Sequence, residues 1–332
     1  MSEPYVLVVG DVNTDMIVPY PTRAADGSLC FTNPTVIGGG SAANTAHALR
    51  RLGHPVEFMG TVGADAAGRQ CRAEFTAAGI GCRALLTDAA LNTVCVYAFV
   101  TPTGERLLWP YPQEQQSFRE LDAAKVDWSL LDGACWVHSS GMVYSSDSSA
   151  PPTVTALLAA ARSRGIPVSF DLNLRIENYG FSADYQRRIL DACEQATYLF
   201  GSEREEFAQL VLEATPEITG DAAQRLVRPG RHIITRDGRA GSTAYTVEGV
   251  WRAAAFEVNA SDTIGAGDVF NAGFIHALLC GDTIAAALTA GNAVAGFKVS
   301  RTGARATPNI DQLAAFIANT PTVITQANSQ QH

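Results

Sequence analysis

The sequence predicts an α/β protein in which a parallel β-sheet lies between two layers of helices. Three observations support this fold class. Short apolar runs typical of buried strands alternate with longer segments of helical periodicity along most of the 332 residues. Clusters of glycine stand where two of the helices begin, near residues 38 and 265. Two segments rich in hairpin signals interrupt the alternation, and they predict a smaller β-sheet beside the main one.

The strands and helices follow one another in order. The first apolar run, residues 5–9, ends at Gly10 and Asp11 and is typical of a buried parallel strand. The glycines at 38–40 open a helix that Gly53 ends. Further strands are expected at 56–62, 134–139, 168–171, 197–200 and 232–235, with a hairpin over 242–258. Further helices are expected at 65–78, 154–164, 185–195, 204–213, 267–279, 283–300 and 309–318.

Two segments do not fit this alternation of strands and helices. Residues 13–36 contain three prolines, and residues 93–112 read as two strands around the turn Thr101-Pro-Thr-Gly. We expect these segments to form one discontinuous β lid. The main domain then comprises residues 1–12, 37–92 and 113–319, and the polar residues 320–332 form a flexible tail.

Composition excludes several classes of protein. The net charge of −9, from 24 Lys and Arg against 33 Asp and Glu, argues against nucleic acid or an anionic membrane as partner. No apolar run is long enough for a transmembrane helix, and the N-terminus lacks the basic region of a signal peptide. Seven scattered cysteines without a CxxC pair argue against a disulfide framework and against a zinc site. These features favour a cytoplasmic protein.

The strongest chemical signal is Asp262-Thr-Ile-Gly-Ala-Gly-Asp268, which leads into an apolar helix. Gly265 and Gly267 permit a tight turn, so that the N–H groups of residues 265–268 point outward at a helix N-terminus. Such a turn binds anions and suits the charge that develops during phosphoryl transfer. The Asp268 carboxylate can accept the proton of an attacking hydroxyl. The alternative is a first-turn acid that only complements the helix dipole.

A second polar cluster lies near the start of the chain. Asn13 and Asp15 follow the first buried strand, and Asn44 lies in the first turn of the helix after the glycine cluster. Such side chains are natural partners for sugar hydroxyls, which both donate and accept hydrogen bonds. Gly39 and Gly40 allow a ligand to approach closely. The alternative is ordinary capping of loops.

Together these segments resemble the two signatures of the ribokinase, or PfkB-type, family of carbohydrate kinases. The glycine-rich segment 38–53 is similar to the N-terminal signature, and residues 262–268 are similar to the C-terminal one. The resemblance covers residue 6 to about residue 317. It implies a three-layer ribokinase-like fold with a β lid. It also implies transfer of the γ-phosphate of ATP, bound with Mg²⁺, to a hydroxymethyl group of a small sugar.

The resemblance also implies roles for individual residues. It makes Asp268 the catalytic base and places the anion hole at Gly265, Ala266 and Gly267. The implied sugar-binding residues are Asn13, Asp15, Gly39, Gly40, Asn44, Arg175 and Asp268. The implied ATP-binding residues are Ser202, Thr235, Asp237, Gly238, Gly241, Gly267 and Asn292. A loop pair that holds K⁺ in potassium-activated members is matched by Asp262, Ile264, Lys298, Arg301, Gly303 and Thr307. This match predicts activation by K⁺ over Na⁺.

One family motif is altered. The Asn-x-x-Glu segment that orients water around Mg²⁺ appears here as Ser202-Glu-Arg-Glu205, with Ser in place of Asn. We expect Glu205 to take the role of the glutamate, with Glu206 as its competitor. The alternative is a solvated helix face in a run of charges.

The sugar is less well defined. Asp171-Leu-Asn-Leu-Arg175 is similar to segments of the fructokinase-like and 2-keto-3-deoxygluconate kinase-like branches. We expect Arg175 to face a phosphate or an acidic group, the alternative being a structural arginine that pairs with Asp171 or with a helix end. The Trp109-Pro-Tyr111 segment lacks the Tyr-Arg pair of the keto-acid branch. The segment 137–141 lacks the acidic residue of ribokinases proper. Lids of this kind often pair between subunits, so a homodimer is expected.

Two other functions remain open at this point. One is a nucleoside kinase of the same family, because the segment 199–203 slightly resembles adenosine kinases. The other is a regulator that binds sugar or nucleotide without catalysis, although the intact Asp268 argues against it. A dehydrogenase is disfavoured because no Gly-x-Gly-x-x-Gly follows the first strand.

Overall fold

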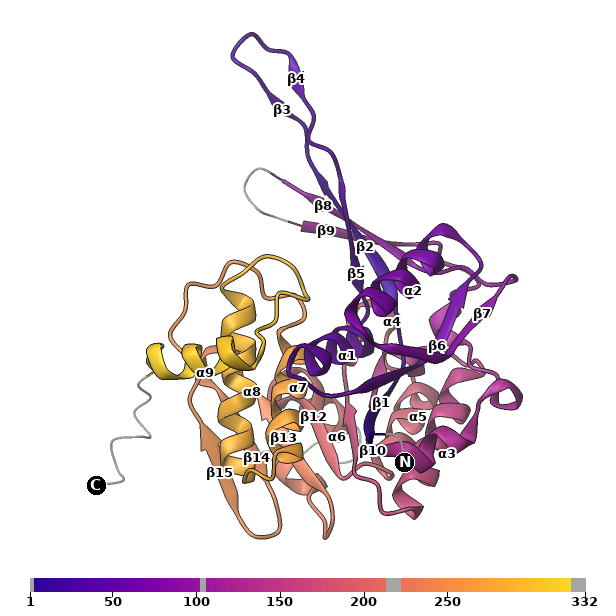
Figure 1. The fold of residues 1–332 in the computed structure, drawn as a ribbon, viewed down its shortest axis with the longest axis vertical. Coiled ribbons are helices and arrows are strands. Elements are labelled where there is room, and N and C mark those ends of the chain that lie inside the picture. Colours follow the sequence, from indigo (N-terminus) through magenta and orange to yellow (C-terminus); the bar gives the residue numbers. More distant parts are fainter. Residues whose placement is uncertain (1–2, 102–105, 213–221, 324–332) are drawn as a thin grey trace.

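The computed structural model describes residues 3–101, 106–212 and 222–323. At its centre is a nine-stranded sheet in the order β15-β14-β13-β12-β11-β10-β1-β6-β7 (Figure 1). In chain order these strands are β1 (Tyr5–Val9), β6 (Val56–Gly63), β7 (Gly81–Asp88), β10 (Ala134–Ser140), β11 (Val168–Asp171), β12 (Tyr198–Ser202), β13 (His232–Arg236), β14 (Ser242–Tyr245) and β15 (Val250–Ala253). The strands from β13 to β7 are parallel, and β14 and β15 extend the sheet as an antiparallel hairpin.

Helices cover both faces of this sheet, as predicted. They are α1 (Ser41–Arg51), α2 (Ala66–Ala78), α3 (Ala150–Ser163), α4 (Ile176–Tyr179), α5 (Ala183–Cys193), α6 (Ala208–Leu212), α7 (Ala266–Leu279), α8 (Ile284–Val299) and α9 (Ile310–Asn319). Successive side chains of β1 point to opposite faces. Val6 and Val8 pack in one core with α1, α2, α7, α8 and α9, whereas Leu7 and Val9 pack in the other with α3 and α5. This explains why the first strand is apolar throughout.

A second, four-stranded sheet projects from the main body in the order β5-β2-β8-β9 (Figure 1). Its strands are β2 (Asn13–Pro19), β5 (Thr35–Gly39), β8 (Cys95–Val100) and β9 (Arg106–Tyr111). They come from the two segments predicted to form the lid, and β5 continues to Gly39, past the expected end at residue 36. The small hairpin β3 (Thr22–Arg23) and β4 (Leu29–Cys30) lies at its far end. The tip of the predicted turn, residues 102–105, lies outside the described residues.

The predicted elements differ from the structure in a few places. The edge strand β7 was not predicted, because its residues are mostly half-buried and show no clear alternation. Helix α3 starts at Ala150, ahead of the predicted residue 154, because prolines are tolerated in the first helical turn. The helix expected over 204–213 is a five-residue π-turn, Glu203–Phe207, followed by α6. Within the described residues, no helix has the length and apolar character needed to cross a membrane.

Candidate active site

The candidate site lies where α1 and α7 begin, at the carboxyl edge of the parallel sheet. Asp11 follows β1 and accepts hydrogen bonds from the backbone N–H groups of Ser41 (2.7 Å) and Ala42 (3.1 Å) at the start of α1. Gly40 precedes the helix with φ 98°, and a Cβ there would lie 2.7 Å from the Asp11 carbonyl oxygen. The Asp11 carboxylate and the glycine thus fix the entry to α1 beside the end of β1.

Asp268, in the first turn of α7, is held by residues of α1. The Ser41 hydroxyl donates to its Oδ1 (2.6 Å) and the Asn44 amide donates to its Oδ2 (2.9 Å). The Thr45 hydroxyl donates to its main-chain oxygen at 3.1 Å. Burial raises the pKa of Asp268 to about 6, although the hydrogen bonds from Ser41 and Asn44 act in the opposite direction. The carboxylate keeps free lone pairs and has a fixed orientation.

Arg305 fixes the orientation of the Asn44 amide. Its Nε donates to Asn44 Oδ1 (3.3 Å), so the amide nitrogen of Asn44 faces Asp268. The same guanidinium donates to Glu74 Oε2 (2.6 Å) and to the Gly39 carbonyl (3.1 Å). Arg305 therefore joins the predicted sugar-binding residues of α1 and β5 into one network. It was not predicted, because nothing in its neighbourhood marks it out.

Asn13 and Asp15 lie together at the start of β2, the first lid strand. The Asn13 amide donates to Asp15 Oδ1 at 2.7 Å. Burial raises the pKa of Asp15 to about 6, while Asn13 and Arg305 oppose this rise. β2 pairs with β5, and Asn13 lies opposite Gly39. The structure therefore brings together Asn13, Asp15 and Gly39, three of the residues predicted to bind the sugar.

The turn before α7 has the backbone conformation that an anion hole requires. Gly265 adopts φ 77° as the residue that precedes the helix, a left-handed conformation that favours glycine. The Ala266 amide donates to the Thr263 carbonyl at 3.2 Å. The amides of Gly267 and Asp268 have no acceptor among the described residues, so they point out of the helix N-terminus unpaired.

Below this turn lies a buried charged cluster that the sequence did not predict. The Arg236 guanidinium binds Asp171 through two hydrogen bonds (2.8 and 3.0 Å), and Arg236 Nη1 also donates to Asn271 Oδ1 (3.0 Å). Asn271 in turn donates to Asp171 at 2.7 Å. Burial opposes ionisation of Asp171, but the adjacent guanidinium outweighs it and lowers the pKa. A Cβ on Gly267 would lie 2.7 Å from Arg236, so this cation directly adjoins the predicted anion hole.

Glu206, not Glu205, faces this cluster. Glu206 is buried, accepts hydrogen bonds from the backbone N–H groups of Ser202 (2.7 Å) and Leu174 (2.8 Å), and lies 3.8 Å from Arg236. Burial and the charge of Asp171 raise its pKa. Glu205 is exposed on the outer side of the turn. The structure therefore places Glu206 inward, and not the predicted Glu205, because the π-turn adds one residue between Ser202 and the inward-facing carboxylate.

Most of the residues predicted to bind a nucleotide lie around the ends of β12 and β13. The hydroxyl of Ser202 is buried without a hydrogen-bond partner among the described residues. Thr235 is buried near the end of β13. The Asp237 amide donates to the Gly241 carbonyl (2.9 Å), which closes a short loop through Gly238. The Asn292 amide of α8 donates to the carbonyls of Ala253 and Ala254, both at 3.0 Å, so it holds the chain after β15.

The loop pair predicted to hold a cation is tied together by Asp262. Its carboxylate accepts hydrogen bonds from the backbone N–H groups of Ile264 (3.1 Å) and Gly303 (2.9 Å). The fully buried Lys298 donates from Nζ to the Asp262 carbonyl at 2.6 Å and lies 3.6 Å from Asp262 Oδ1. Arg301 donates to the Phe297 carbonyl and covers the Phe297 ring at the end of α8. The Thr307 hydroxyl is buried and donates to the Arg305 carbonyl at 3.4 Å.

Arg175 differs from the other charged residues of the site. It follows β11 at the start of the short helix α4 and is exposed. Within the described part of the chain, no side-chain hydrogen bond or ion pair involves its guanidinium. Asp171 pairs with Arg236 instead, so the alternative that Arg175 pairs with Asp171 is excluded. The positive charge of Arg175 acts on the buried Asp11 carboxyl, where it opposes the rise in pKa that burial causes.

Comparison with known proteins identifies the family. The pfkB family carbohydrate kinase model matches residues 3–311, and the chain belongs to this family. An ATP-dependent ribose-1-phosphate kinase of Halopiger xanaduensis is 29% identical over 314 residues, covering 94% of this chain and 98% of the relative. A 5-dehydro-2-deoxygluconokinase of Listeria monocytogenes is 25% identical over 316 residues, covering 94% of this chain and 95% of the relative. The protein is therefore an ATP-dependent sugar kinase, as the sequence predicted.

Solved structures confirm the ribokinase-like fold. A fructokinase of Xylella fastidiosa with bound ATP has a TM-score of 0.80 and 23% identity, covering 95% of this chain and 98% of that one. A protein of E. coli described as ribokinase II, in complex with ATP and Mg²⁺, has a TM-score of 0.81 and 23% identity, covering 95% and 99%. At this level of identity these structures establish the shared fold alone.

Proposed function

We propose that this kinase phosphorylates a sugar that carries an anionic group, and that Arg175 binds that group. The exposed, unpaired guanidinium of Arg175 at the carboxyl edge of the sheet is the observation that carries this proposal. A planar guanidinium binds phosphate and carboxylate in a bidentate manner. Two relatives fit, since the name of one specifies ribose 1-phosphate and the name of the other specifies a gluconate derivative.

We propose that Asp268 is the catalytic base of the reaction. Its carboxylate accepts the proton of the attacking hydroxymethyl group, while Ser41 and Asn44 hold it in place. The unpaired amides of Gly267 and Asp268 stabilise the negative charge that develops on the transferred phosphoryl group. Arg236 is a positioning residue that supports this turn from below through Gly267. The lid sheet closes over the sugar and excludes water, which limits hydrolysis of ATP.

The residues near β12 fit the Mg²⁺ that accompanies ATP. The buried Ser202 hydroxyl has no partner in the described structure, and the Glu206 carboxylate is directed at the charged cluster beside it. Oxygen ligands and water-mediated contacts of this kind suit Mg²⁺, which retains several waters in proteins. We propose that Glu206 and Ser202 bind water molecules coordinated to Mg²⁺. The bound ion would neutralise negative charge on the phosphates of ATP.

A coupled assay of ADP release tests the choice of substrate. The panel contains ribose 1-phosphate, 5-dehydro-2-deoxygluconate, 2-keto-3-deoxygluconate, fructose, ribose, adenosine and pseudouridine. We expect the highest kcat/KM for a sugar phosphate or sugar acid. Arg175→Gln should raise the KM for that substrate at least tenfold and leave neutral sugars unchanged. The exposed Arg187, which pairs with Asp184 on α5, provides the control Arg187→Gln. A nucleoside or neutral sugar as best substrate contradicts the proposal.

We propose that Lys298 supplies the positive charge that K⁺ supplies in potassium-activated members of the family. The loop pair contains the residues that matched a potassium site, and that match predicted K⁺ activation. However, the Lys298 ammonium already contacts the Asp262 carbonyl and lies near its carboxylate. A buried cation in contact with these oxygens leaves little need for a second one. Activity should therefore be equal in potassium and potassium-free buffers.

The variant Lys298→Ala tests this proposal more sharply. Removing the ammonium should lower kcat at least tenfold in sodium buffer, and added K⁺ should restore part of the loss. Arg301→Ala is the control, since Arg301 lies in the same loop pair but contacts the end of α8. Strong K⁺ activation of the wild-type enzyme contradicts the role of Lys298 and supports the original potassium prediction.

We also propose that the lid pairs with that of a second copy. Large apolar side chains are exposed on the lid strands β4 and β9, including Leu29, Leu107, Trp109 and Tyr111. Exposed apolar surface of this kind marks interaction sites. Light scattering should give the mass of a dimer for the wild type and of a monomer for Trp109→Glu. A wild-type monomer at micromolar concentration contradicts the pairing.

A further inference from the structure

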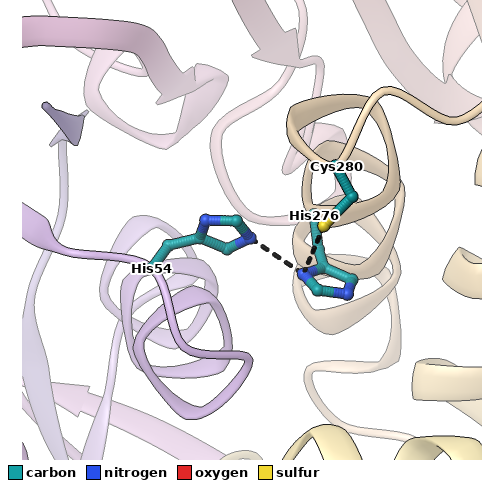
Figure 2. Close-up of side chains that lie close together, drawn as sticks. All are labelled: His54, His276 and Cys280. Atoms are coloured by element: carbon teal, nitrogen blue, oxygen red, sulfur yellow. Dashed lines mark hydrogen bonds between the residues drawn. The ribbon is translucent and has the colours of Figure 1, made fainter.

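A cluster of metal-ligating side chains lies outside the catalytic site, at the opposite end of α7. His276 lies in the last turn of this helix and Cys280 follows its final residue, so the two side chains, four residues apart, share one face. His54 lies in the connection between α1 and β6, 222 residues away in the chain from His276. Figure 2 shows the His54 ring directed at His276, and the Cys280 sulfur approaches the same ring nitrogen of His276.

The donor atoms of this cluster have nearly the spacing of a metal site. His54 Nε2 lies 2.8 Å from His276 Nδ1, and His276 Nδ1 lies 3.9 Å from Cys280 Sγ. All three atoms lie within 4.8 Å of one another. Tetrahedral Zn²⁺ with Zn–N of about 2.0 Å and Zn–S of about 2.3 Å places its ligands about 3.3–3.6 Å apart. Small side-chain rotations, opening the nitrogen pair and drawing in the sulfur, therefore produce this geometry.

We propose that His54, His276 and Cys280 form a zinc site. Two imidazoles and one thiolate are borderline-soft ligands, which favour Zn²⁺ over Mg²⁺ or Ca²⁺. Cys280 is exposed, so the metal reaches the cluster from solvent, and water completes the fourth position. The scattered cysteines argued against such a site, because His54 is 222 residues away from His276 in the chain and only the fold brings it to the other two ligands.

An acidic side chain acts on the cluster. The Asp282 carboxylate interacts electrostatically with His276. It would add negative charge near the bound cation.

The site would join two helices that share the catalytic machinery. Helix α1 supplies Ser41 and Asn44, α7 supplies Asp268, and both helices begin at the catalytic site. His54 follows the end of α1, and Cys280 follows the end of α7. A metal ion here ties these two helices together at their far ends. Its binding should therefore raise the thermal stability of the whole α/β domain.

Cobalt and zinc binding to the nucleotide-free protein tests the proposal. After treatment with a chelator and desalting, added Co²⁺ should produce a thiolate-to-cobalt charge-transfer band at one equivalent, and Zn²⁺ should abolish it. Cys280→Ser should remove the band. In competition with a chromophoric chelator, both Cys280→Ser and His54→Gln should lower the affinity for Zn²⁺ at least tenfold. Cys30→Ser, which alters an exposed cysteine of the lid, is the control and should bind like the wild type.

A melting experiment shows whether the variants remain folded. Without metal, each variant should melt close to the wild type, and Zn²⁺ should raise the melting temperature of the wild type and Cys30→Ser only. The proposal is overturned if the wild type gives no charge-transfer band. It is equally overturned if the band survives in Cys280→Ser, or if His54→Gln binds Zn²⁺ as tightly as the wild type.

Discussion

Two arginines at the same edge of the sheet differ in almost every physical respect. Arg236 lies in the floor of the site, where its guanidinium is bound by Asp171 and Asn271 and adjoins Glu206. Arg175 follows β11 at the rim of the site, exposed and without a side-chain partner among the described residues. A cation that is already paired supports the structure around it. An unpaired cation at the rim remains available to a ligand.

This contrast predicts that changes in the floor of the site affect kcat, whereas changes at the rim affect KM. In the proposed mechanism, groups in the floor act on the developing charge or hold the groups that do. The rim would bind a part of the substrate that is unchanged in the reaction, so it would contribute equally to ground state and transition state. The variant Arg175→Gln described above tests the rim, and the following experiments test the floor, from the largest expected effect to the smallest.

Replacing the proposed base should have the largest effect. Asp268→Asn should lower kcat by about 100- to 10,000-fold, the usual contribution of a general base. The affinity for ATP should remain close to that of the wild type, because the change preserves the shape of the side chain. Single-turnover kinetics and nucleotide titration measure the two quantities. Near-normal turnover would remove Asp268 from its proposed role.

Breaking the buried ion pair should destabilise the fold as well as slow the reaction. Arg236→Gln leaves Asp171 and Glu206 buried without their cation, which costs about 3–5 kcal/mol in comparable cases. The exposed pair of Arg228 with Glu194 provides the matched control, because Arg228→Gln should cost about 1 kcal/mol or less. Unfolding in urea measures both variants. Equal losses of stability would mean that Arg236 is no more important than a surface arginine.

The two adjacent glutamates offer a narrower comparison. Glu206→Gln should lower activity by about 10- to 100-fold at limiting Mg²⁺, as expected for a residue that positions metal-bound water. Glu205→Gln should leave activity unchanged, because Glu205 is exposed on the outside of the π-turn. Steady-state rates across a Mg²⁺ titration compare the two. The opposite ranking would restore the sequence-based choice of Glu205.

The pH dependence should show the smallest but most specific change. Burial raises the pKa of Asp268 to about 6, so the carboxyl is protonated, and catalysis lost, as the pH falls through that value. The acidic limb of kcat/KM should therefore lie near pH 6. Asn44→Ala removes a hydrogen bond that lowers this pKa, so the limb should move to higher pH. Burial also raises the pKa of Asp15 to about 6, so Asp15 could cause the same acidic limb. If the acidic limb of Asp15→Asn is unchanged, the limb is assigned to Asp268.

Local patterns in the sequence determined the fold class and the outline of the site. Continuous apolar strands alternating with helices allow only a parallel sheet with both faces covered. Gly265, Gly267 and Asp268 act through backbone conformation and nearest neighbours, so their arrangement was predictable from the residues themselves. The same holds for the glycines that precede α1.

Only the tertiary structure decided which charges pair and which stay free. Arg236 and Asp171 are 65 residues apart, and Arg305 and Asn44 are 261 apart, so their contacts depend on strand order and helix packing. One residue added by the π-turn placed Glu206, and not Glu205, inside the site. His54 meets His276 and Cys280 for the same reason. Side-chain pairing depends on distances in space, whereas a sequence specifies distances only along the chain.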